Sequence, residues 1–260
     1  MYNFLLAAGV YIGLFLLLYL SVKLGYLFGM QRRKDDKTTG NVYGVVKVAE
    51  GTVFALLGLL IAFTFSGAYD RFENRKLKII EEINAIEEAY NSVDLLKPSF
   101  QPPMRNLIKQ YADHRIETYK RIAEFTGFEQ ELHRVDDILN KVWLKAVATI
   151  KANNDETTSL LFIPYINNML NIGKTRVLIT RIHPPIPIFG LLIGLAALSA
   201  FLVGHGMAKD KKFNVLYTLC FVIITAFTLY VIIDLEFPRV GMIRVDQFDH
   251  LLSEMRNDLR

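Results

Sequence analysis

The sequence predicts an all-α membrane protein, with four transmembrane helices and a helical extramembrane domain between the second and the third. Hydrophobic residues make up 52% of the 260 residues, yet charged residues still make up 22%, a mixture typical of membrane spans joined to an aqueous part. Four apolar stretches are long enough to cross a hydrocarbon core about 30 Å thick. The polar remainder has helical periodicity and lacks alternating strand patterns and hairpin turn signals.

Residues 1–69 are predicted to hold the first two transmembrane helices. Within the first, at 3–29, only Lys23 interrupts the apolar run, and a lysine side chain can reach the membrane interface. The stretch lacks a basic leading segment and a cleavage pattern, so we expect a retained anchor rather than a signal peptide. The second span is uncharged from Gly51 to Tyr69 and continues into a polar helical pattern without proline. We therefore predict one long helix that leaves the membrane and enters the next domain.

Residues 70–182 are predicted to form the helical extramembrane domain. The long helix continues through it with one apolar face, formed by Ile79, Ile83, Ile86, Tyr90 and Val93. The prolines in the stretch PSFQPP at 98–103 end that helix, because consecutive prolines cannot continue one. Further helical patterns follow, and NNDE at 153–156 is a turn and helix-start signal.

Residues 183–235 are predicted to hold the third and fourth transmembrane helices, and residues 236–260 an amphipathic tail. HPPIP at 183–187 precedes the third span, and the basic loop HGMAKDKK separates it from the fourth. In the tail, one face carries Phe248, Leu251, Leu252 and Met255, so we expect it to dock on the helical domain.

The orientation in the membrane stays open on charge alone. Four spans place both termini and the helical domain on the same side. Basic residues near the span ends divide almost evenly between the two sides, and the absence of a basic residue before the first span favours an outside N-terminus.

Several segments resemble the bestrophin-like domain family of bacterial membrane proteins, whose activity is largely unassigned. The resemblance extends from Glu50 onward and is carried by GLLIAFTFSGAYDRFENRK, EEINAIEEAYNSVDLL, the helix with Tyr111, Arg115 and Tyr119, LNIGKTRVLITRIHPP, and YVIIDLEFPRVGMIRVDQFDHLL. By analogy with true bestrophins, it implies a homo-oligomeric ion channel in the bacterial plasma (inner) membrane, with a cytoplasmic helical domain. No acidic cluster resembles the bestrophin calcium clasp, so calcium gating is not implied.

A stripe of small residues in the second span is the main candidate for a functional surface. Small side chains recur there at three- and four-residue steps, which lets helices pack closely in lipid or lets one face line a pore. Hydroxyl groups and apolar constrictions are typical of ion paths. The pore-lining candidates are Ala55, Gly58, Ala62, Phe63, Thr64, Phe65 and Ser66.

Charged residues gather where the second and fourth spans end on one side of the membrane. They can form interfacial salt bridges within one subunit, or a ring of charge at a pore mouth after assembly. The pore-mouth candidates are Asp70, Arg71, Glu73, Arg75, Asp234, Glu236 and Arg239. The acids favour cations and the arginines favour anions; because the span itself offers no fixed positive charge, we expect a preference for cations.

Other function classes lack a signature in the sequence. There is no phosphate-binding glycine loop, no GxSxG, no CxxC and no histidine pair at metal-ligand spacing, so we expect neither an enzyme nor a cofactor or metal site. The interleaved charges do not form a nucleic-acid footprint. Tyr111, Arg115 and Tyr119 lie four residues apart on one helix and can bind an anion or form a stacked structural stripe. The sequence predicts an ion channel in a lipid bilayer, and the alternative is a membrane-anchored scaffold or sensor whose helical domain binds a protein partner.

Overall fold

The computed structural model describes residues 2–32, 41–123, 128–153, 155–180, 182–208, 213–238, 241–245 and 248–259. In these ranges the chain forms eight α-helices and one 3₁₀ helix, with no β-strand. Two compact units are present, which we call the membrane unit (Met1–Arg71 with His183–Ile243) and the helical unit (Phe72–Ile182 with Arg244–Arg260). The predicted all-α fold is confirmed.

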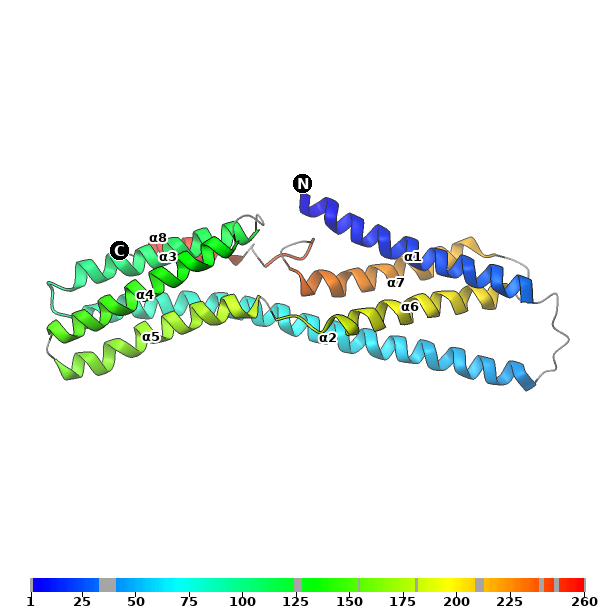
Figure 1. The fold of residues 1–260 in the computed structure, drawn as a ribbon, viewed down its shortest axis with the longest axis horizontal. Coiled ribbons are helices and arrows are strands. Elements are labelled where there is room, and N and C mark those ends of the chain that lie inside the picture. The colour runs from blue at the N-terminus through cyan, green and yellow to red at the C-terminus, as the bar shows by residue number, and fades with distance from the viewer. Residues whose placement is uncertain are drawn as a thin grey trace. The chain divides into compact units, whose positions relative to one another are not determined.

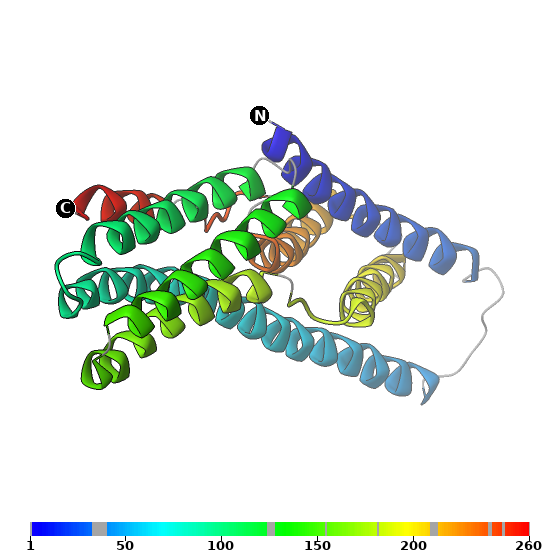
Figure 2. The same cartoon turned by 60° about the vertical axis from the view of Figure 1, so that its left-hand side comes forward.

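Among the described residues, four helices are long and apolar enough to cross a membrane, as predicted. They are α1 (Tyr2–Arg32), α2 (Asn41–Ser92), α6 (Ile186–Met207) and α7 (Val215–Glu236). The second is one continuous helix of 52 residues, drawn as an unbroken ribbon in Figure 2. A span needs only about 20 residues. Its uncharged part, Gly51 to Tyr69, is therefore long enough to cross the bilayer, and from Phe72 onward α2 belongs to the helical unit.

Glycines allow a close helix contact in the membrane unit, between α1 and α6. A Cβ atom on Gly25 would lie 1.9 Å from the backbone oxygen of Phe201, and one on Gly204 would lie 1.9 Å from that of Val22. Only residues without a side chain allow the two backbones to approach this closely. By contrast, a Cβ on Gly190 or Gly194 would meet nothing within 4 Å.

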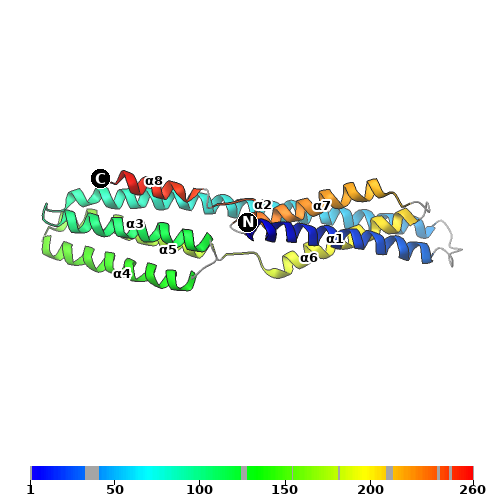
Figure 3. The same cartoon turned by 90° about the horizontal axis from the view of Figure 1, so that it is seen from above.

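The helical unit combines the end of α2 with α3 (Gln101–Ala123), α4 (Phe128–Asn153), α5 (Glu156–Ile179) and α8 (His250–Asp258). Figures 1 and 3 show α3, α4 and α5 running alongside one another. Apolar side chains from all five helices form one core. The tail helix docks as predicted, because Leu252 and Met255 are buried in that core.

Two predicted helix boundaries are present in the helical unit. A 3₁₀ turn, Val93–Leu95, follows α2, and α3 begins at Gln101 with two prolines in its first turn, where their missing N–H groups cost nothing. At the start of α5, the Asp155 carboxylate accepts a hydrogen bond of 3.1 Å from the backbone N–H of Thr157.

Candidate functional site

The small-residue stripe of the second span lies on an uncovered face of α2. Ala55, Gly58, Ala62 and Ser66 are all exposed, and nothing lies within 4 Å of a Cβ built on Gly58. In the most apolar window of this helix only 6% of the residues are buried inside the chain, against 22% to 33% in the other three spans. This face is therefore left for lipid or for other copies of the chain.

The other pore-lining candidates lie on the two flanks of this face and on the opposite side of α2. Phe63 and Phe65 are 69% and 42% exposed, and the ring of Phe65 stacks on that of Tyr69 at 6.5 Å. Thr64 is half-buried, and its hydroxyl donates a 2.7 Å hydrogen bond to the backbone oxygen of Leu60. Side chains two positions apart along a helix differ by about 200° in direction. Thr64 and Ser66 therefore point to opposite sides of α2.

A buried carboxylate connects the ends of the second and fourth spans. Glu236 is fully buried, and its Oε2 accepts a 2.7 Å hydrogen bond from Nε of Arg71. Its Oε1 lies 3.1 Å from Nδ1 of His183, whose ring stacks on Phe237 at 4.7 Å. Burying a carboxylate costs free energy unless it is paired and hydrogen-bonded. Arg71 and Glu236 thus neutralise each other within one chain.

Asp234 holds a turn. Its Oδ2 accepts hydrogen bonds from the backbone N–H groups of Met242, at 3.0 Å, and Ile243, at 2.8 Å. Gly241 leaves room for the carboxylate, because a Cβ there would lie 1.3 Å from Oδ1. The side chain is buried, so its charge serves this turn rather than an open surface.

The remaining pore-mouth candidates differ in their exposure. Glu73 pairs with Lys76 at 3.0 Å. Arg75 is buried, and within the helical unit its Nη2 donates a 3.2 Å hydrogen bond to the backbone oxygen of Ile182. Arg239 lies outside the described residues. Asp70 is exposed and has no hydrogen bond or ion pair with any other described residue, so it is the free acid at the end of the second span.

A separate buried charge network lies inside the helical unit. Glu82 is fully buried between two guanidinium groups: Arg115 donates to its Oε1 and Arg176 to its Oε2. The Tyr119 hydroxyl accepts from Arg115 and donates to Glu82 at 3.3 Å, and its ring lies 3.5 Å from the Arg176 guanidinium. Arg176 also pairs with Asp249, just before the tail helix. The network cross-links α2, α3, α5 and the tail.

The charges of this network hold one another in their ionised forms. Burial alone would raise the pKa of the Glu82 carboxyl, but the charges of Arg115 and Arg176 lower it below its usual value. Burial would likewise lower the pKa of the Arg115 guanidinium, and the adjacent Glu82 raises it instead. Burial raises the pKa of the Tyr111 and Tyr119 hydroxyls, which therefore stay protonated. Of the two open readings of the helix with Tyr111, Arg115 and Tyr119, this geometry favours the structural one.

Glu82 is not among the residues that the sequence patterns single out, although a signal is present. It lies three residues after Ile79 and four before Ile86, which places it on the apolar face of the long helix. An acid on such a face needs a cationic partner. The sequence alone did not show that Arg115 and Arg176, 33 and 94 residues away, supply it.

Gly173 gives a testable link between the network and the packing of α5. Its backbone oxygen accepts a 3.0 Å hydrogen bond from Arg115, and a Cβ there would lie 2.2 Å from the Tyr111 hydroxyl. That hydroxyl is buried without a partner among the described residues. We expect Gly173→Ala to destabilise the helical unit by about 1–3 kcal/mol, a typical overpacking cost.

Tyr111→Phe removes the clashing atom and an unsatisfied buried hydroxyl, so it is expected to be neutral or stabilising alone and to restore most of the stability of Gly173→Ala. Urea unfolding of the purified full-length protein, followed by fluorescence of its single tryptophan, Trp143 in α4, measures all three variants. A double variant as unstable as Gly173→Ala would contradict this account.

Comparison with known protein families assigns the chain to a family. A family model for the bestrophin-like domain matches residues 13–247, which include the helical domain and all or most of each of the four apolar helices. No curated protein and no solved structure matches the chain. In the described residues, no group of three or more histidine, cysteine, aspartate or glutamate side chains is placed to hold a metal ion. This integral membrane protein belongs to the bestrophin-like domain family.

Proposed function

We propose that the protein is an ion channel, in which copies of the chain assemble around an axis lined by the exposed face of α2. The observation that carries the proposal is the second span, which is nearly uncovered within its own chain while the other spans pack on one another. Its open face combines small residues with the hydroxyl of Ser66, and the Phe63 and Phe65 rings flank it. Water-accessible hydroxyls and apolar constrictions suit ion conduction. Family membership supports the same function by analogy.

Cations are the proposed substrate. Of the charges at the end of the second span, Arg71 is neutralised by Glu236 and Glu73 by Lys76, whereas Asp70 is exposed and unpaired among the described residues. Repeating Asp70 around an axis would give a ring of negative charge, which concentrates cations at a pore mouth. We place the channel in the bacterial plasma membrane, as the family resemblance implies.

Blocking the stripe tests the pore. Purified protein in liposomes should pass K⁺ or Na⁺ down a gradient, and Ser66→Phe should abolish most of that flux while assembly is intact, because the ring fills the proposed path. The control is Leu56→Phe, which adds an aromatic ring to an exposed position about 80° from Ser66 around the helix. Flux that Ser66→Phe leaves unchanged would exclude this face of α2 as the path.

Neutralising the free acid tests the selectivity. Asp70→Asn should reduce the permeability ratio of K⁺ to Cl⁻ several-fold, because it removes the exposed negative charge. Glu73→Gln should change the ratio less, because Glu73 is already paired with Lys76. The reversal potential in asymmetric KCl across a planar bilayer measures both variants. An unchanged ratio in Asp70→Asn would exclude Asp70 as the selectivity determinant.

The alternative function is a membrane-anchored scaffold or sensor. It is favoured by a basic groove on the surface of the helical unit, between α3 and α4. A scaffold would leave liposomes impermeable under K⁺, Na⁺ and Cl⁻ gradients alike, so the flux experiment separates the two functions.

A further inference from the structure

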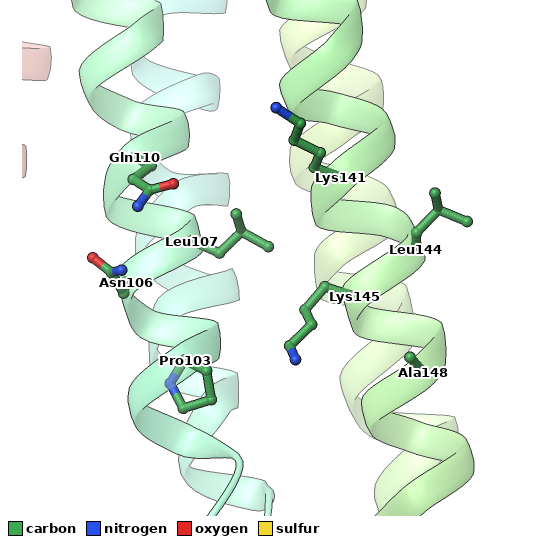
Figure 4. A pocket seen from close by; sticks show the side chains of 8 residues that line it. All are labelled: Pro103, Asn106, Leu107, Gln110, Lys141, Leu144, Lys145 and Ala148. Carbon is green, nitrogen blue, oxygen red and sulfur yellow. The ribbon is translucent and has the colours of Figure 1, made fainter.

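An open groove lies between α3 and α4 on the helical unit. It encloses about 510 Å³ and is lined by Pro103, Asn106, Leu107 and Gln110 from α3, and by Lys141, Leu144, Lys145 and Ala148 from α4. Each wall has its residues at positions i, i+3, i+4 and i+7, so each is one face of a helix. Figure 4 shows Lys141 and Lys145 extending from α4 toward α3, and Leu107 extending from α3 toward α4.

The groove is positive. Lys141 and Lys145 are exposed and have no ion pair with any other described residue, and no acid lines either wall. The polar side chains of the α3 wall, Asn106 and Gln110, carry amide groups that can donate hydrogen bonds. Two lysines four residues apart on a helix repel each other, so the pair lowers the stability of α4 unless an anion lies between them.

The apolar part of the groove is not used by the core of the unit. Leu144 is 68% exposed, whereas Val142 and Ala146 of the same helix are fully buried. Leu107, on the opposite wall, is only half-buried. A surface that combines exposed leucine with unpaired lysine offers both hydrophobic contact and charge attraction to an occupant.

We propose that this groove docks an acidic amphipathic helix from a partner protein. Such a helix would place its apolar face over Leu107 and Leu144, and carboxylates one turn apart beside Lys141 and Lys145. A free phosphate would use the lysines alone and leave the leucines exposed. This docking surface is independent of ion conduction, and it identifies the kind of partner that the helical unit recruits.

The test is binding of a defined peptide to the full-length protein in detergent. The probe is a fluorescent peptide of about 18 residues, long enough to form a helix, with leucines on one face and glutamates beside them. Fluorescence anisotropy should give saturable binding that weakens with added salt. A control peptide with lysine in place of each glutamate should not bind.

Matched variants locate the binding. Lys141→Glu combined with Lys145→Glu should weaken the affinity at least about tenfold, because it replaces attraction with repulsion. The control, Lys151→Glu combined with Lys174→Glu, changes the net charge equally at exposed lysines outside the groove and should leave the affinity unchanged. Leu144→Asp should also weaken binding, which distinguishes helix docking from capture of an anion by lysines alone.

Four outcomes would overturn the proposal. The first is no binding, and the second is equal weakening by the two double variants. The third is that anionic lipid vesicles displace the peptide and bind in its place, which would make the groove a membrane contact. The fourth is a smaller assembly for Leu144→Asp in size-exclusion chromatography, which would make the groove an interface between copies of this chain.

Discussion

Glu82→Gln is expected to destabilise the helical unit by about 3–5 kcal/mol, the range for removing one partner of a buried ion pair. The substitution keeps the size of the side chain but removes the only fully buried negative charge of the network, so the buried guanidinium groups of Arg115 and Arg176 lose their shared counter-charge. Urea unfolding followed by Trp143 fluorescence measures the loss, because Trp143 lies in α4 of the same unit.

Glu73→Gln is the control for Glu82→Gln. Glu73 pairs with Lys76, but its side chain is 35% exposed, so its loss should cost only about 0–1 kcal/mol.

The pH dependence of stability provides a second measurement for Glu82→Gln. Because the folded pKa of Glu82 is below its unfolded value, its contribution is complete above the usual glutamate range and is lost as the pH falls through the folded value. Glu82→Gln should therefore lose less stability on acidification than the unmodified protein, and equal losses would contradict the predicted role.

The helices could be predicted from the sequence because their signals are local. An uncharged apolar run, a spacing of three and four residues and a pair of prolines each act within a few turns of chain. They were sufficient for the continuous α2, for its end before Pro98 and for the docking face of the tail.

The state of each charge could not be predicted, because it depends on distant residues. Asp70 and Asp234 look alike in the sequence, as acids at the ends of apolar spans. In the structure Asp234 is buried against a turn that Gly241 makes possible, while Asp70 is exposed. Glu236 is likewise buried because Arg71 and His183 meet it from other segments. Tertiary contacts therefore decide which of the pore-mouth candidates remains exposed and unpaired among the described residues.

Tertiary contacts also decide which glycines of the third span are needed for packing, although these glycines look equivalent in the sequence. Gly204→Ala tests this in the membrane unit. The new Cβ would lie 1.9 Å from the backbone oxygen of Val22 and 2.9 Å from the backbone nitrogen of Tyr26. Backbone atoms cannot rotate away as a side chain can, so α1 must separate from α6. We expect a loss of about 3 kcal/mol, the upper part of the overpacking range, and a clearly lower Tm by circular dichroism in detergent.

Gly194→Ala is the matched control on the same helix, because a Cβ there would meet nothing within 4 Å. Alanine also has a higher intrinsic helix propensity than glycine, so this variant should retain or slightly raise the Tm. Equal losses in the two variants would mean that glycine matters for the helix itself and not for its contact with α1. A loss confined to Gly204→Ala would identify close backbone packing, rather than the general small-residue character of the third span, as the interaction that holds α6 against α1.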